Sequence, residues 1–539
     1  MKKPKLLDVG EAELAAVSCR LEQGRLEEAD YPVLKAAIET LLYLRRLLER
    51  KDTAMQRVLR MLFGARTEKT SKVLPEKPPP AKAKSTTNKK RKGHGRRGAA
   101  AYWGAEKITV SHEGLSPGQS CPDCGNAKLY DTQRPAVLIR LCAQPPVAGK
   151  IFELQKLRCG LCGKLFSASA PQEAGQEKHD ANLAPMLGLL RYGYGMPMNR
   201  LERMQEDFGV PLPAGTQWDL IRDHAEELSP VWEELLRQAA EGQVIYNDDT
   251  TVRILAVEKQ IREAEDKEHP DGKGRTGLFT TGILSIQTDP SNPEMKDRTI
   301  ALFFSGRDHA GENLQKVLDE RPQQLPSPIQ MCDGLSRNEP SSAETLMANC
   351  NAHARRGFVS AASSFPEQCR HVLETIQQIY RHENTTRAEG MSAAQRLQFH
   401  QQHSAHPMEN LKQWMEQKIE DKEVEPNSSL GEAINYMLNR WEPLTLFLRR
   451  PGAPIDNNIC ERALKMSIRH RNNSLFYKTE NGAHIGDLFM SLIHTCRFAR
   501  VNPYDYLSHL RRHLQELRED PSQWMPWNYQ VTAAALAGQ

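Results

Sequence analysis

A chain of 539 residues is long enough for about three or four domains and a large buried core. Its net charge is only +4, so no overall electrostatic field argues for a nucleic-acid partner, and only local clusters of charge are informative. The eleven cysteines are scattered, no secretory segment follows Met1, and no apolar run approaches the roughly 20 residues that cross a bilayer. We therefore expect a reduced, cytoplasmic protein with no membrane role.

The first region, 1–68, is predicted to be a helical coiled coil. Between Tyr31 and Phe63, apolar side chains recur at intervals of seven; they are Leu34, Leu41, Leu48, Met55 and Leu62. About four heptads are enough to propose a leucine zipper, and therefore a homodimer or higher oligomer. The alternative is a single amphipathic helix that packs inside the chain.

A basic segment follows at 69–100. From Lys69 to Arg97 there is one acid, Glu76, against eleven lysines and arginines. Such a composition cannot bury a core, so we predict a disordered linker. It would act either as a tether or as a salt-sensitive contact with DNA phosphates.

Two C-x-x-C knuckles lie in the region 101–172. Cys121 and Cys124 form the first, and Cys159 and Cys162 form the second. Four thiolates in two knuckles, each followed by glycine, suit tetrahedral coordination of Zn²⁺. We predict a zinc ribbon that holds one structural ion, with strands between the knuckles.

Residues 180–240 are helical in pattern. Within them, Met198 to Asp223 reads as two helical runs that Gly209 and the turn at 211–213 separate. This pattern is that of a helix-turn-helix, which binds DNA in some proteins and is an ordinary helical hairpin in many others.

The region 241–510 alternates strand-like and helix-like pieces. Strands are predicted at 243–257, 277–287 and 299–305, then a helix from His309 to Leu318, a strand ending at Asp333, a helix over 343–347 and a strand reaching Cys350. This is the order of a ribonuclease H-like α/β domain with a mixed sheet. An all-α insertion is expected at about 366–447, and a C-terminal tail at 511–539. The fold class as a whole is multidomain α+β.

Three acids stand where such a domain would bring them together. Asp248 lies in a strand-like run, Asp333 ends another, and Glu461 lies in the first turns of a helix that opens at Asp456 and Asn457. Acids are depleted in strands because desolvating a carboxylate is costly unless a cation or donors compensate it. Three such carboxylates can hold two Mg²⁺ or Mn²⁺ ions. Each acid alone is equally typical of a solvated turn or a helix cap.

The chain resembles the insertion-sequence transposases of the transposase C type, the IS66 group. The resemblance covers nearly the whole length and rests on the cysteine knuckles and on five ordered motifs: Leu62-Phe63-Gly64 with Glu68-Lys69, residues 351–356 (NAHARR), 441–445 (WEPLT), 456–458 (DNN) with 461–463 (ERA), and 502–507 (NPYDYL). Such a series of motifs in order is highly specific.

The resemblance implies a ribonuclease H-like transposase. Its Asp-Asp-Glu triad maps onto Asp248, Asp333 and Glu461. Its activity would be metal-dependent cleavage and strand transfer at the terminal inverted repeats of its own element, on double-stranded DNA and in association with the nucleoid. It also implies a leucine zipper, a zinc finger and companion proteins of the same element. The family usually has Asp-Glu-Thr at the first acid, so Asp249 is a rival ligand.

Basic side chains near these motifs are candidates for phosphate contacts. They are Arg355, Arg356, Arg462, Lys465 and Arg471. His353 would position a phosphate or satisfy a hydrogen bond in the core.

Two other functions are compatible with the residues. The coiled coil, linker and zinc ribbon would also serve a non-catalytic DNA-binding protein, in which the acids are only a scaffold. A ribonuclease H-like nuclease would cleave without joining. Metal-dependent cleavage separates the first alternative from a transposase, and joined products separate the second.

Overall fold

The computed structural model describes residues 11–38, 73, 107–112, 114–124, 126–131, 137–140, 145–158, 165–264, 276–288 and 297–538. The chain divides into two compact units, one of Met1–Glu76 with Gly149–Gln539 and one of Lys77–Ala148. The heptads beyond residue 38 and the predicted linker, apart from residue 73, lie outside the described residues. No helix in the described ranges is both long and apolar enough to cross a membrane.

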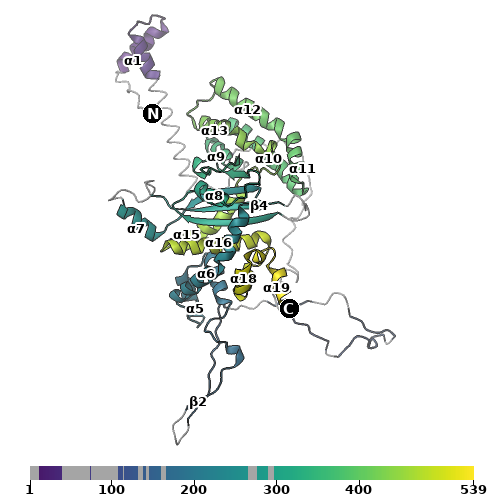
Figure 1. Cartoon of the computed structure of the whole chain (residues 1–539). Coiled ribbons are helices and arrows are strands. Elements are labelled where there is room, and N and C mark those ends of the chain that lie inside the picture. Colours follow the sequence, from purple (N-terminus) through teal and green to yellow (C-terminus); the bar gives the residue numbers. More distant parts are fainter. Residues whose placement is uncertain are drawn as a thin grey trace. The chain divides into compact units, whose positions relative to one another are not determined.

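A five-stranded mixed sheet forms the centre of the larger unit (Figure 1). The strand order is β5-β4-β3-β6-β7. Strands β3, β4 and β5 are antiparallel neighbours, whereas β6 and β7 run parallel to β3. The bounds are β3 Val244–Thr251, β4 Phe279–Gln287, β5 Arg298–Gly306, β6 Ile329–Cys332 and β7 Leu346–Asn349.

The sheet differs from the sequence prediction at two places. The first strand ends at Thr251, and Leu255–Ala264 form helix α7. The helix predicted over 343–347 is wrong, because Leu346–Asn349 form strand β7. Alanine, glutamate, leucine and methionine favour helices, but pairing of this segment with the buried strand β6 outweighs that local preference. The predicted helix after β5 is present as α8, Ala310–Asp319.

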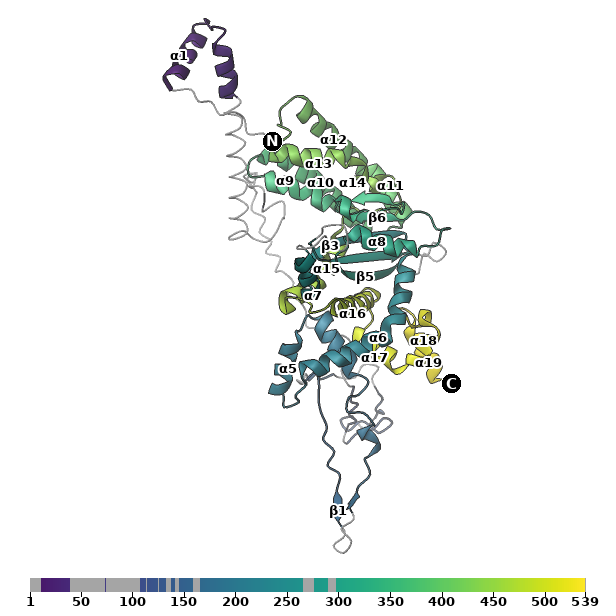
Figure 2. The ribbon, with the colours of Figure 1, turned by 60° about the vertical axis from the view of Figure 1, so that its left-hand side comes forward.

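Helices fill the segment 351–448. They lie together on the β6–β7 side of the sheet, whereas α6 and α16 lie on the β5 side (Figure 2). A buried ion network joins this helical group: Glu383 is 3% exposed and accepts from Arg387, Arg396 and His400. The bounds are α9 Asn351–Ala361, α10 Pro366–Ala388, α11 Ala393–His403, α12 Ala405–Glu420, α13 Ser429–Asn439, α14 Trp441–Leu444 and η5 Leu446–Leu448.

Two helices joined by a turn precede the sheet, as the pattern at 198–223 predicts. Helix α5 spans Met198–Asp207 and α6 spans Ala214–Ala239. The buried amide of Gln217 donates to the carbonyl of Leu212 at 2.8 Å and so closes the turn. Before them come β1 Lys156–Arg158, β2 Leu165–Ser167, η2 Gln172–Ala174, α4 Leu183–Gly188 and the π-helical turn η3 Leu189–Gly193; the N-terminal helix α1 is Glu11–Glu22.

The C-terminal part is helical to residue 537. The segment that the sequence leaves as a tail is folded, and the side chains of Trp524 and Tyr529 are each 1% exposed. The tyrosine hydroxyl of Tyr506 fixes it by donating to the carbonyl of Trp524 at 2.8 Å. The bounds are α15 Asn458–Ser474, α16 Glu480–Ala499, α17 Pro503–Arg512, α18 Leu514–Glu519, η6 Pro521–Trp524 and α19 Tyr529–Ala537.

Helix α16 hydrogen-bonds to the edge strand β5. The backbone N–H groups of Ala301, Phe303 and Ser305 point away from β4, and each donates to a side chain of α16. The acceptors stand four residues apart in the helix; they are Thr495 at 3.0 Å, Ser491 at 3.0 Å and Asp487 at 2.6 Å. Four residues of helix rise about 6 Å, close to the rise of two residues of strand. Every fourth residue of α16 can therefore bond to every second residue of β5.

This contact makes stability depend on pH. Burial raises the pKa of Asp487 to about 7, although the N–H and hydroxyl of Ser305 donate to it. The folded chain therefore holds this proton more tightly than the unfolded chain. The contribution of Asp487 to stability is complete below about pH 4 and is lost as the pH rises to about 7.

Asp487→Asn keeps the shape of the side chain. We predict that its thermal stability relative to the wild type increases as the pH is raised from pH 5 to pH 8. The expected gain is on the order of a few kcal/mol, because the amide carries no charge to desolvate. Melting temperatures of both chains at the two pH values test it. A difference between the chains that stays constant with pH would contradict the buried-acid argument.

Candidate active site

Two carboxylates lie where the parallel pairing of β3 with β6 ends. Tyr246 of β3 pairs with Met331 of β6, so Asp248 and Asp333 each stand two residues beyond a paired position. Residues two apart in a strand share a face of the sheet, and both strands run the same way. The register therefore brings both acids to the same end and the same face.

Helix α15 carries the third acid across this end of the sheet. The amide of Asn457 donates to the carbonyl of Asn247 at 3.1 Å, and Cys460 donates to the carbonyl of Gly282 at 3.3 Å. A Cβ at Gly282 would lie 3.0 Å from Leu464, so the glycine permits this close approach. Glu461 lies in the first turn of α15, as the sequence predicts.

Asp248 and Asp333 repel each other. Burial and then the charge of Asp333 raise the pKa of Asp248 to about 7, and Asp249 and Glu461 add to the repulsion. Asp333 is half-buried and accepts from the amide of Asn338. No cationic side chain of the described residues forms an ion pair with Asp248 or Asp333. The pair therefore has no cation, and the N–H of Asp249 on Asp248 and the amide of Asn338 on Asp333 offset the buried charge only in part.

Asp249 is compensated by the protein itself. Its side chain is 2% exposed and pairs with His309 at 3.1 Å and with Arg337 at 3.2 Å. Arg337 also lies over the ring of Phe279, which packs on His309. These contacts engage both oxygens of Asp249, so the geometry favours Asp248 over its rival as a ligand.

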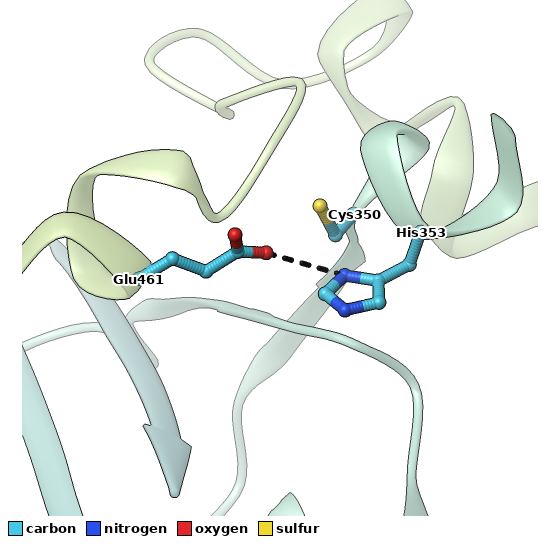
Figure 3. Close-up of side chains that lie close together, drawn as sticks. All are labelled: Cys350, His353 and Glu461. Atoms are coloured by element: carbon cyan, nitrogen blue, oxygen red, sulfur yellow. Dashed lines mark ion pairs between the residues drawn. The ribbon is translucent and has the colours of Figure 1, made fainter. Parts of the chain in front are cut away.

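Glu461 faces a cysteine and a histidine from the end of β7. Cys350 directly follows that strand and His353 lies in the first turn of α9, and both side chains point toward the carboxylate (Figure 3). One ligand atom of each of the three residues lies within 4.8 Å of the others, a grouping that could hold a metal ion. Burial raises the pKa of the Cys350 thiol to about 11.

Arg356 supplies the positive charge at this grouping. It donates to Glu461 at 3.2 Å and to Nε2 of His353 at 2.8 Å. An arginine can only donate, so Nε2 accepts, and the proton of the neutral ring is on Nδ1, which is 3.7 Å from Glu461. A metal ion on all three groups would have to displace this proton and Arg356. At the Asp248–Asp333 pair a cation would meet no such competition, because neither acid has an ion-pair partner among the described residues.

The predicted DNA-contacting residues lie in different environments. Arg462 and Lys465 are exposed on the outer side of α15. Arg471 instead donates to the backbone and hydroxyl of Thr251 and to Thr250, so it fixes α15 to the end of β3. Arg356 pairs with Glu461, and its neighbour Arg355 is partly buried.

One of the two cysteine knuckles can be described. The backbone N–H groups of Cys124 and Asp123 donate to the sulfur of Cys121 and lower its pKa. The N–H of Cys121 in turn donates to the carbonyl of Ala127 at 2.7 Å. Sulfur that accepts backbone amides suits a thiolate ligand of Zn²⁺. Cys159 and Cys162 lie outside the described residues, between the paired strands β1 and β2.

Sequence reasoning did not predict the contacts of several residues that shape this site. Asn338 donates to Asp333, and Asn457 ties α15 to β3. A polar residue in a loop or before a helix gives no sign in the sequence of which residue it will bind. Cys350 did have a signal, because a cysteine that ends a strand three residues before a histidine is a metal-ligand spacing. His309 and Arg337 become visible only when the sheet is assembled.

The raised pKa of Asp248 predicts pH-dependent cation binding. Since this carboxyl must lose its proton to bind a divalent cation, the affinity for Mn²⁺ should rise about fivefold from pH 6 to pH 7, about twofold more by pH 8, and then level off. Titration calorimetry at the three pH values measures it. Asp487→Asn is the control, because it removes the other acid whose pKa is about 7 and should leave the rise intact. A pH-independent affinity would refute the assignment.

Comparison with known proteins identifies the family. The model of the Transposase IS66 family matches residues 180–485, more than half of the chain. Two uncharacterized proteins of Sinorhizobium fredii (strain NBRC 101917 / NGR234) are similar. The protein y4hP is 24% identical over 447 residues, 78% of this chain and 75% of its own length, and y4qI is 26% identical over 371 residues, 65% and 63% respectively. The chain belongs to the Transposase IS66 family.

Proposed function

We propose that this protein is a DNA transposase that cleaves and joins DNA at the ends of its own insertion sequence. The observation that carries the proposal is the pair Asp248 and Asp333, two carboxylates at one end of the sheet without a protein cation, with Glu461 beside them on α15. Membership of the transposase family supports it independently.

The sheet supports a ribonuclease H-like catalytic domain. Three antiparallel strands, followed by two strands parallel to the first, in the order β5-β4-β3-β6-β7, agree with the fold inferred from the sequence. The first acid stands on the central strand and the second on its parallel neighbour. In this proposal the helices of 366–448 are an insertion between the second and third acids.

Asp248, Asp333 and Glu461 would hold two Mg²⁺ or Mn²⁺ ions. Bound in this way, the ions activate the attacking oxygen and stabilise the leaving oxygen of a phosphodiester. The protein contributes position: α15 brings Glu461 to the strand ends, and Asn338 orients Asp333. Arg356 pairs with Glu461 at 3.2 Å, and its guanidinium would be able to contact a phosphate if Glu461 served as a metal ligand.

Other parts of the chain would bind the DNA. Arg462 and Lys465 form an exposed basic strip on α15 beside Glu461, suited to contacts with phosphates. We assign end recognition to the α5–α6 pair and to a zinc ribbon built on Cys121, Cys124, Cys159 and Cys162. A coiled coil in 1–68 would join protomers, and companion proteins of the element would complete the reaction.

The decisive test is a strand-transfer assay. Purified protein, Mg²⁺ and a labelled duplex with the element's terminal repeat should give cleaved and joined products. Asp248→Asn, Asp333→Asn and Glu461→Gln should each lower the rate at least about a hundredfold, because a displaced or missing ligand ruins the alignment of the reacting atoms. Binding of the repeat should persist in all three variants.

Asp249→Asn is the matched control, because this acid is adjacent in sequence but paired with His309 and Arg337. It should keep substantial activity. Cleavage without joined product would indicate a nuclease. Binding without cleavage, even after the companion proteins are added, would indicate a DNA-binding protein whose acids have no catalytic role.

A further inference from the structure

The helical insertion contacts the backbone that carries Asp333. The hydroxyl of Tyr436, in α13, donates to the carbonyl of Asp333 at 2.8 Å. Arg440, which follows α13, donates twice to the carbonyl of Gly334, from Nε at 3.2 Å and from Nη2 at 3.0 Å. The guanidinium of Arg440 also lies 4.4 Å from the ring centroid of Tyr436, so the two side chains support each other.

The turn after Asp333 is shaped to accept this contact. Gly334 has a φ of +74°, which an L side chain rarely adopts. A Cβ at this position would lie 2.8 Å from Nε of Arg440 and 3.1 Å from Oδ1 of Asn349. The glycine therefore allows both the backbone conformation and the close approach of the arginine.

The opposite side of the same loop is tied to the sheet. The buried Asn338 donates its amide to the carboxylate of Asp333. The carbonyl of Asn338 accepts from Asn247 and from Gln330, each at 2.7 Å. One side of the loop is thus fixed by β3 and β6, and the other side by α13. Asp333 cannot move without breaking one of these two sets of contacts.

Helix α13 is itself firmly placed. It packs on α9, and a Cβ added at Gly357 of α9 would lie 3.0 Å from that of Ala433. Helix α9 begins immediately after Cys350, at the same end of the sheet as the acids. Packing contacts therefore run without a break from α9 to α13 of the insertion, and from α13 to the backbone of Asp333.

We propose that Tyr436 and Arg440 are positioning residues, through which the helical insertion sets the place of the Asp333 carboxylate for cation binding. The inference rests on the proposed function, since it takes Asp333 as a metal ligand. Mg²⁺ demands near-ideal octahedral geometry and tolerates little displacement of a carboxylate. Loss of the hydroxyl of Tyr436 should therefore weaken cation binding and leave the fold intact.

The test compares Tyr436→Phe with Tyr506→Phe. Each substitution removes one hydroxyl that donates to a backbone carbonyl at 2.8 Å, but Tyr506 contacts Trp524, in the C-terminal helices. Direct titration with Mg²⁺ should give a dissociation constant roughly threefold to tenfold higher for Tyr436→Phe and an unchanged value for Tyr506→Phe. Melting temperatures should fall by similar amounts. Arg440→Lys, which keeps the charge but not the paired donors, should weaken Mg²⁺ binding in the same way.

Three results would overturn the proposal: unchanged Mg²⁺ binding in Tyr436→Phe, equal weakening in both tyrosine variants, or weakening that only accompanies unfolding. Because Mg²⁺ binding is measured without DNA, its result is independent of the strand-transfer assay. A wild-type chain that binds Mg²⁺ but neither cleaves nor joins DNA, even with the companion proteins added, would refute the proposed function and would leave this inference to the tyrosine comparison. A wild-type chain that does not bind Mg²⁺ would refute both.

Discussion

The repulsion between Asp248 and Asp333 is the constraint on which the site depends. Two partly buried carboxylates at adjacent strand ends are unfavourable unless something holds them there, and the raised pKa of Asp248 reflects this cost. Surrounding elements supply the restraint. Asn457 ties α15 to β3, and Asn338 ties the loop of Asp333 to the sheet. These two buried asparagines therefore help to hold the like charges close together.

Asp248, Asp249, Asp333 and Glu461 fall into two pairs. Asp249 and Glu461 have arginine and histidine partners, whereas Asp248 and Asp333 have no such partner among the described residues. Of the two compensated acids, Asp249 is almost fully enclosed, and Glu461 is about a quarter exposed and pairs with a half-exposed Arg356. Glu461 can therefore exchange its partner more readily than Asp249 can. This difference agrees with the proposed roles, in which Glu461 is a metal ligand and Asp249 is structural.

Most strands of the sheet, and the strand or helix to which each of the three acids belongs, could be predicted from the sequence. Acids within or just after strand-like runs and a polar helix start are local signals. Local propensity failed at Leu346–Asn349, because pairing with β6 decides the structure there. Arg471 looked like a phosphate contact but binds the end of β3, since a charged side chain gives no sign of which way it points. Tyr436 binds Asp333 and Arg440 binds Gly334 across about a hundred positions of sequence, and no local pattern encodes these contacts.

The bonds between α16 and β5 have a consequence for assembly. An edge strand with free N–H groups is a template for a strand from another copy, and such pairing leads to swapped or aggregated chains. Here Asp487, Ser491 and Thr495 occupy the N–H groups of Ala301, Phe303 and Ser305. The sheet therefore cannot be extended from β5. Two copies of this chain that associate would therefore have to use other surfaces, because these three N–H groups of β5 are already occupied.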